Sequence, residues 1–120
     1  MSLKLTPFVL NWPSITAGDT FPGFNIAGTD TPDGNDLARV RMQVRNAEND
    51  VVIDYDSDDE GITINNAATW DFNVADIVTP DVAGLYKYDI ETIDSLGVVA
   101  TIIKGAWNVD GQETEWKTLP

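Results

Sequence analysis

Carboxylates are the side chains of this sequence best placed to do chemistry, because it contains no histidine and no cysteine. Zinc sites built from cysteine and histidine, cysteine nucleophiles and histidine bases are therefore excluded. Between positions 48 and 60 lie seven carboxylates and no basic residue, and from Asp54 onward their spacing is like the start of a calcium loop. They are Glu48, Asp50, Asp54, Asp56, Asp58, Asp59 and Glu60.

The candidate metal ligands in this run are Asp54, Asp56 and Asp58, which alternate as the first ligands of a calcium loop do. The rest of the run departs from that pattern. Its sixth position holds Asp59 instead of glycine, and its twelfth holds Asn65 instead of glutamate. We therefore expect a solvated acidic turn and no cofactor, with calcium binding as the alternative. An acid catalyst needs a carboxyl group with a raised pKa, usually from burial, and this run is expected to be exposed, so no enzyme is predicted.

Three of the seven basic residues lie on one face of one predicted strand. They are Arg39, Arg41 and Arg45. We expect cross-strand ion pairs with Asp89 and Glu91 of a neighbouring strand, each worth about 0.2–1 kcal/mol when exposed. The alternative is an arginine row that binds an acidic partner, such as a second copy of this protein.

Composition excludes further classes of function. The chain has 120 residues, with 20 acidic against 7 basic side chains and a formal net charge of −13. A surface this negative repels phosphate backbones, so we expect no nucleic-acid partner. No apolar run reaches the roughly 18 residues of a membrane span, and the first residues lack a signal-peptide pattern. We therefore expect no membrane partner, and synthesis in the cytoplasm.

Alternation of apolar and polar residues predicts about eight β-strands and almost no helix. Short, evenly spaced strands without crossover helices favour an all-β antiparallel sandwich or barrel. The predicted strands are Leu3–Leu10, Phe21–Ala27, Ala38–Arg45, Val51–Tyr55, Ile62–Ile64, Thr69–Val74, Leu85–Ile93 and Val98–Val109.

The predicted domain is flanked by two short segments. Residues 1–14 form an N-terminal arm or edge strand, residues 15–110 a β-sandwich domain and residues 111–120 a polar C-terminal tail. Trp12 falls in the arm and Trp116 in the tail, so neither has an obvious place in a core. Aromatic side chains in terminal segments often anchor interfaces, and folding back over the domain is the alternative.

The segment Asp81–Tyr88 resembles a corner of the immunoglobulin family, in which Asp-x-(Gly/Ala)-x-Tyr-x-Cys leads into a strand. In that family the tyrosine hydroxyl bonds to backbone upstream and fixes the corner between two sheets. The resemblance implies that Asp81 and Gly84 form the corner and that Tyr86 is its tyrosine. Tyr88 stands where the family has cysteine. The implied fold is an immunoglobulin-like sandwich of about seven to eight strands.

Four short patterns occur in this order along the chain: Ile15–Phe21 with a Gly-Asp turn, Asp36–Arg45 ending in Gln-x-Arg, Gly84–Asp89, and Thr101–Val109. Together they resemble small all-β virion proteins of phages and prophages, including the N-terminal domain of the baseplate upper protein. The resemblance implies a non-enzymatic structural protein of the virion, associated with a tail, baseplate or neck. Its implied partners are further copies of itself, in a homo-oligomer, and other virion proteins. It would be made in the cytoplasm of the bacterial host.

Two alternatives remain open from the sequence. The first is an acidic immunoglobulin-like module that binds a carbohydrate or serves adhesion, with or without calcium. The second is an inhibitor that mimics DNA through its negative surface.

Overall fold

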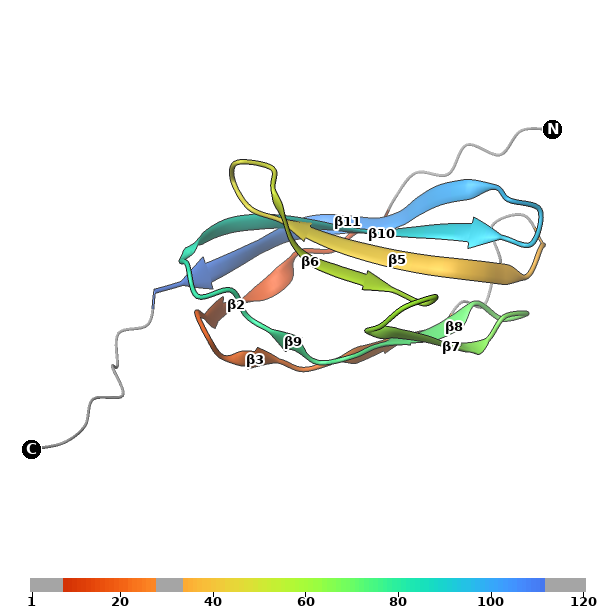
Figure 1. Ribbon diagram of the computed structural model, residues 1–120, viewed down its shortest axis with the longest axis horizontal. Helices are drawn as coiled ribbons and strands as arrows, with labels where there is room; N and C mark the ends of the chain where they lie inside the picture. The colour runs from red at the N-terminus through yellow and green to blue at the C-terminus, as the bar shows by residue number, and fades with distance from the viewer. Residues whose placement is uncertain (1–7, 28–33, 112–120) are drawn as a thin grey trace, which may run out of the picture.

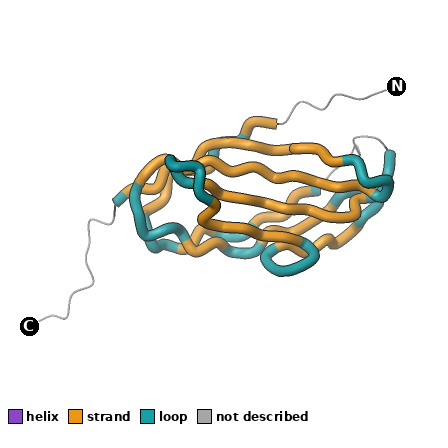
Figure 2. The backbone as a smooth tube through the Cα atoms, turned by 45° about the horizontal axis from the view of Figure 1, so that its top comes forward, coloured by secondary structure: helices purple, strands orange, loops and turns teal. Residues whose placement is uncertain are grey.

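The computed structural model describes residues 8–27 and 34–111 as two facing layers of β-strands (Figures 1 and 2). The larger sheet has the order β1-β11-β10-β5-β6, and β2 also pairs with β11. Its central strands pair antiparallel, whereas β1 and β2 run parallel to β11. Its members are β1 (Phe8–Val9), β2 (Trp12–Thr16), β5 (Leu37–Arg45), β6 (Val51–Asp56), β10 (Gly84–Asp94) and β11 (Val99–Asp110).

The opposite layer consists of a three-stranded sheet, β4-β8-β7, and the short pair β3-β9. All pairs in this layer are antiparallel. The described residues form no helix that could cross a membrane. The predicted all-β, immunoglobulin-like sandwich is thereby confirmed. The strands of this layer are β3 (Thr20–Phe21), β4 (Phe24–Ile26), β7 (Ile62–Asn66), β8 (Asp71–Val74) and β9 (Ile77–Val78).

The predicted strand Phe21–Ala27 is interrupted, and Pro22 and Gly23 lie at the break. Gly23 passes so close to β8 that a Cβ atom there would lie 2.9 Å from the carbonyl carbon of Ala75. The Gly23 amide donates to the Asp76 carboxylate at 2.6 Å. The interruption therefore follows from close backbone approach, and it separates β3 from β4.

The first described strands, β1 and β2, begin within the segment 1–14 that was expected to be an arm or edge strand. β2 begins at Trp12, and its register with β11 sets Trp12 beside Trp107 and Ile15 beside Val109. Sequence propensity does not predict this strand, because Pro13 lies in it and proline is rare in strands other than edge strands. The predicted strand Leu3–Leu10 is represented by β1 alone, since residues 1–7 lie outside the described residues.

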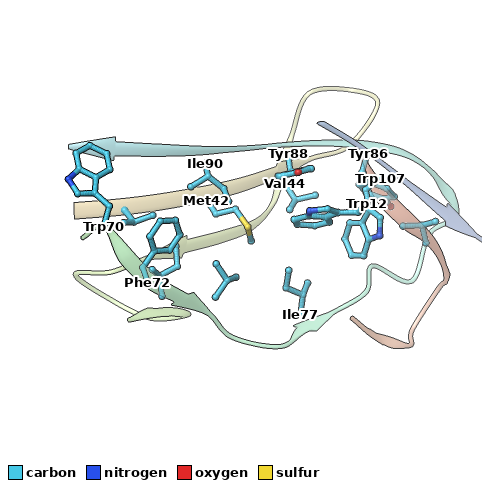
Figure 3. Close-up of a cluster of buried hydrophobic side chains, with 14 of the residues drawn as sticks. Trp12, Met42, Val44, Trp70, Phe72, Ile77, Tyr86, Tyr88, Ile90 and Trp107 are labelled. Carbon is cyan, nitrogen blue, oxygen red and sulfur yellow. The ribbon is translucent and has the colours of Figure 1, made fainter. Parts of the chain in front are cut away.

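The core fills the space between the layers (Figure 3). Alternate residues of β5 and β10 point inward, as their alternation of buried and exposed positions shows. Trp12, Tyr86, Tyr88 and Trp107 gather toward one end of the core, and Trp70 lies at the other. The fully buried hydrophobic residues include Val40, Met42, Val44, Phe72, Val74, Ile77, Ile90 and Trp107.

Candidate functional site

An apolar cleft of about 670 Å³ lies between the β1–β2 edge of the large sheet and strand β4 of the other. Its volume is in the range of ligand sites. Side chains from segments far apart in the sequence line it, and almost all are apolar. We call this the apolar cleft. Its lining residues are Phe8, Leu10, Asn11, Trp12, Pro13, Ser14, Ile15, Phe21, Pro22, Phe24, Asn25, Ile26, Tyr88, Ile90 and Ile103.

One wall of the apolar cleft is fixed where the chain passes from β1 to β2. The Leu10 amide donates to the Lys104 carbonyl at 2.9 Å, and the Ala106 amide donates to Asn11 Oδ1 at 3.0 Å. The Tyr88 hydroxyl donates to the Leu10 carbonyl. Gly105 leaves room for this arrangement, since a Cβ atom there would lie 2.7 Å from the Leu10 carbonyl carbon. These contacts hold the edge strand in place without a disulfide.

Aromatic rings form the base of the apolar cleft. The Trp12 ring stacks on Tyr88 with centroids 3.9 Å apart and on Phe21 at 4.9 Å. It meets Phe24 edge-on at 5.9 Å. Burial raises the pKa of Tyr88 to about 12, so its hydroxyl remains a donor at neutral pH. Trp12 is only 7% exposed, so of the two alternatives for this side chain the structure favours folding back over the domain, where it is a core residue.

The apolar cleft lies along an open sheet edge. β4 pairs with β8 on one side, and among the described strands none pairs with its other side. The outer edge of β1 is likewise the end of the large sheet. Open edges carry backbone N–H and C=O groups that can bond to a further extended chain. Phe8, Val9 and Leu10 on the β1 side are 65%, 61% and 47% exposed.

The corner residues Asp81, Gly84 and Tyr86 do not line the apolar cleft, whereas Tyr88 does. The Tyr86 hydroxyl donates to the Val82 carbonyl at 2.6 Å, which is the local bond expected of a corner tyrosine. Gly84 has a φ of +155°, and Asp81 is exposed. Tyr88, in the position of the family's cysteine, is buried and reaches across to Leu10.

The arginine row forms ion pairs, but with β6 instead of β10. Arg39 binds Asp56 with Nη2 and Oδ2 2.5 Å apart, and Arg41 binds Asp54 at 2.8 Å. The expected partners Asp89 and Glu91 are not used, although the register sets Glu91 directly opposite Arg41. The aspartates of β6 accept bidentate hydrogen bonds from these guanidinium groups, and such geometry outcompetes a single contact.

The same pairs occupy the candidate metal ligands. Hydrogen bonds from Arg41 and Arg39 hold the pKa values of Asp54 and Asp56 below their ordinary range. Asp58 also lies 3.4 Å from Arg39. Within residues 8–27 and 34–111, no three side chains of the kinds that hold a metal ion come together.

Arg45 differs from the other two arginines. It donates to the Asn49 carbonyl at 3.0 Å and to Gln43 Oε1 at 2.9 Å, both uncharged acceptors. Trp116, the other proposed interface anchor, lies outside the described residues.

No family model and no curated protein matches the chain. Among solved structures, CopC from Methylosinus trichosporium OB3b is similar, with a TM-score of 0.50 and 12% sequence identity. The match covers 86% of this chain and 88% of that one. At this level of identity the likeness is one of fold.

The prediction of a virion structural protein is wrong, because the likeness found over most of the chain is to CopC and not to a virion protein. The residues of this chain do not fit a copper site either. Copper takes histidine, cysteine or methionine ligands. The chain has no histidine or cysteine, and of its two methionines Met42 is fully buried and Met1 lies outside the described residues. We therefore derive no metal chemistry from the likeness.

Sequence reasoning missed the apolar cleft altogether. Its lining comes from the β1–β2 region, from β3 and β4, and from β10 and β11. No local motif joins these segments. The one available signal was the density of aromatic residues between Phe8 and Phe24, which includes Trp12 and Phe21.

Proposed function

We propose that the protein is a non-catalytic peptide-binding protein whose apolar cleft takes an extended segment of another protein. The observation that carries this proposal is the open edge of β4 alongside an almost wholly apolar cleft. An extended peptide uses both features at once. Its backbone bonds to the strand edge, and every second side chain enters the apolar cleft.

The alternation within β4 suits this mode of binding. Phe24, Asn25 and Ile26 all border the apolar cleft, but the polar side chain of Asn25 is engaged on its own sheet, where it donates to the Asp71 carboxylate at 2.9 Å. β4 is three residues long, so a peptide would pair over about three residues, or roughly 10 Å. Such a short pairing leaves much of the affinity to apolar side chains in the cleft.

The negative net charge of the protein favours a basic partner. A net charge of −13 attracts basic segments and speeds their encounter. The best ligand is therefore an extended segment with alternate apolar side chains and lysine or arginine at its ends. A second copy of this chain carries the same charge of −13 and is repelled, although its own β1 strand is apolar and exposed.

A labelled peptide tests the proposal directly. The probe is a nine-residue fluorescein peptide in which five residues alternate valine and threonine between two pairs of lysines. Binding is followed by fluorescence anisotropy with wild type, Leu10→Ser and Leu85→Ser. The two leucines are matched, being 47% and 53% exposed, but only Leu10 lines the apolar cleft.

We expect saturable binding that Leu10→Ser weakens about fivefold, as the loss of about 1 kcal/mol of apolar contact predicts. Leu85→Ser should bind as the wild type does. A peptide N-methylated at alternate backbone positions should not bind, because it cannot pair with a strand edge.

Equal effects of the two leucine variants, or equal binding of the N-methylated peptide, would overturn the proposal. So would a homodimer, seen by light scattering, that excludes the peptide. Near-UV circular dichroism checks that Leu10→Ser is folded, and Phe8→Ser at a 65% exposed position repeats the test.

A further inference from the structure

A second hollow lies on the outer face of the large sheet, away from the core. It has a volume of about 510 Å³ and extends over β1, β11, β10 and β5. We call it the basic hollow, because Arg45, Lys87 and Lys104 line it. Asp89 is the carboxylate among its lining residues. The remaining members are Val9, Asn11, Gln43, Asn49, Tyr88, Gly105 and Ala106.

These three cations are unlike the other two in the described part of the chain. Arg39 and Arg41 are paired with carboxylates of β6. Within residues 8–27 and 34–111, no ion pair closer than 4.0 Å involves Arg45, Lys87 or Lys104. On a protein with 20 acidic residues, three cations without an ion pair have gathered around one hollow.

The strand register sets two of these cations against each other. Lys87 lies directly opposite Arg45 across β10 and β5. Lys104 lies on the far side of β10, diagonal to Lys87, since Lys87 pairs with Ala106 and Asp89 with Lys104. Like charges directly opposite in a sheet destabilise it, and diagonal neighbours are about 7–8 Å apart. An anion between them would turn this repulsion into attraction.

Hydrogen bonds to uncharged acceptors position the Arg45 guanidinium and leave donors for such an anion. Its guanidinium donates to the Asn49 carbonyl and to Gln43 Oε1, which fix its position without neutralising its charge. An arginine has five N–H donors in a planar fork, so others remain for an oxyanion. Gly105 and Ala106 are small, which keeps the floor of the basic hollow open.

We propose that the basic hollow binds a tetrahedral oxyanion, a phosphate or sulfate group, between Lys87 and Arg45 with Lys104 beside it. A doubly charged tetrahedral anion balances the charge of two facing cations, whereas a carboxylate brings one negative charge for both. The basic hollow shares Asn11 and Tyr88 with the apolar cleft, but its three cations lie outside that cleft, so the proposal stands if no peptide binds there.

The test uses the full-length protein in chloride buffer at constant ionic strength. Inorganic phosphate, sulfate and acetate are titrated separately, and backbone amide shifts of Lys87 and Ala106 are followed by NMR. The variants are Lys87→Gln and Arg41→Gln, which remove the same charge at a site inside the basic hollow and at an ion pair outside it. Thermal melting with and without phosphate is measured for each.

We expect saturable shifts with phosphate and sulfate and none with acetate, despite the net charge of −13. Lys87→Gln should weaken phosphate binding about tenfold or more, as the loss of a charge-assisted hydrogen bond predicts. Arg41→Gln should leave phosphate binding unchanged. In chloride alone, Lys87→Gln should melt at a higher temperature than wild type because the facing charges are relieved.

Four results would overturn the proposal. The first three are shifts that grow linearly without saturating, equal phosphate stabilisation of wild type and Lys87→Gln, and acetate binding as strong as phosphate binding. The fourth is a melting temperature of Lys87→Gln below that of wild type in chloride.

Discussion

Gly105→Ala tests the packing that fixes the wall of the apolar cleft. A Cβ atom at Gly105 would lie 2.7 Å from the Leu10 carbonyl carbon and 2.9 Å from Tyr88 Cε1, and closer still to the Leu10 carbonyl oxygen. Both neighbours are held, because the Tyr88 hydroxyl bonds to that carbonyl and the Tyr88 ring is stacked on Trp12. Neither can move away without losing a contact.

The cost can be estimated from these contacts. Forcing a methyl group into a packed site costs about 1–3 kcal/mol. The displaced Leu10 carbonyl would also lose its hydrogen bond from Tyr88, at about 1 kcal/mol. We therefore expect Gly105→Ala to lower the free energy of unfolding by about 2–4 kcal/mol. With a urea m-value of about 1.5 kcal/mol/M, the midpoint falls by roughly 2 M.

Equilibrium urea unfolding, followed by tryptophan fluorescence, is the assay. Gly111→Ala is the matched control, because its Cβ would meet only the Ala83 Cβ at 3.9 Å, an ordinary contact. It should stay within about 0.5 kcal/mol of wild type, as surface substitutions usually do.

A double-mutant cycle separates the two contributions. Tyr88→Phe alone should cost about 1 kcal/mol, the worth of the lost hydrogen bond. In the Gly105→Ala background it should cost almost nothing, because that bond is already broken, giving a coupling of about 1 kcal/mol. If Gly105→Ala is as stable as Gly111→Ala, or the two changes are additive, the described packing of Leu10 against β11 is refuted.

Three further predictions concern the corner, the core and acid stability. Tyr86→Phe removes the hydrogen bond to the Val82 carbonyl and should lower the free energy of unfolding in urea by about 1 kcal/mol. An unchanged free energy of unfolding would contradict the corner assignment. Trp12→Ala should cost about 3–5 kcal/mol as a core truncation, and a loss below about 1 kcal/mol would mean that Trp12 is a surface residue. The pKa of Asp56 is lowered from 3.8, chiefly by its hydrogen bond from Arg39, so the pair stabilises the fold above about pH 4 and is lost as the pH falls through the folded value. In thermal melting, the Asp56→Asn variant should therefore lose less stability than wild type between about pH 5 and pH 2. Parallel curves of melting temperature against pH would contradict the role of the pair.

Much of the fold follows from the sequence, because period-two alternation is strong wherever one face of a strand is buried. β5 and β10 carry that pattern along their whole length, and both were predicted to within two residues. β2 was missed because Pro13 obscures it, and β3 and β4 were merged because the break at Gly23 depends on contact with a strand fifty residues away. Short strands fixed by distant backbone contacts leave little local signal.

The candidate sites were less accessible to sequence reasoning. The alternation of Arg39 and Arg41 predicted ion pairs but not their partners, since the choice between β6 and β10 depends on side-chain geometry across both neighbours. The basic hollow depends on a register that sets Lys87 against Arg45, which no single strand reveals. The apolar cleft requires the path of β1 and β2 along one edge of the sandwich.

Addition of a peptide to the open edge of β4 can be measured by amide hydrogen exchange of Asn25, Ile26 and their neighbours, with and without the saturating lysine-flanked peptide. We expect slower exchange at alternate β4 amides, with little change on the outer face of β10. Unchanged exchange at β4 under saturating peptide, or protection confined to another surface, would contradict it.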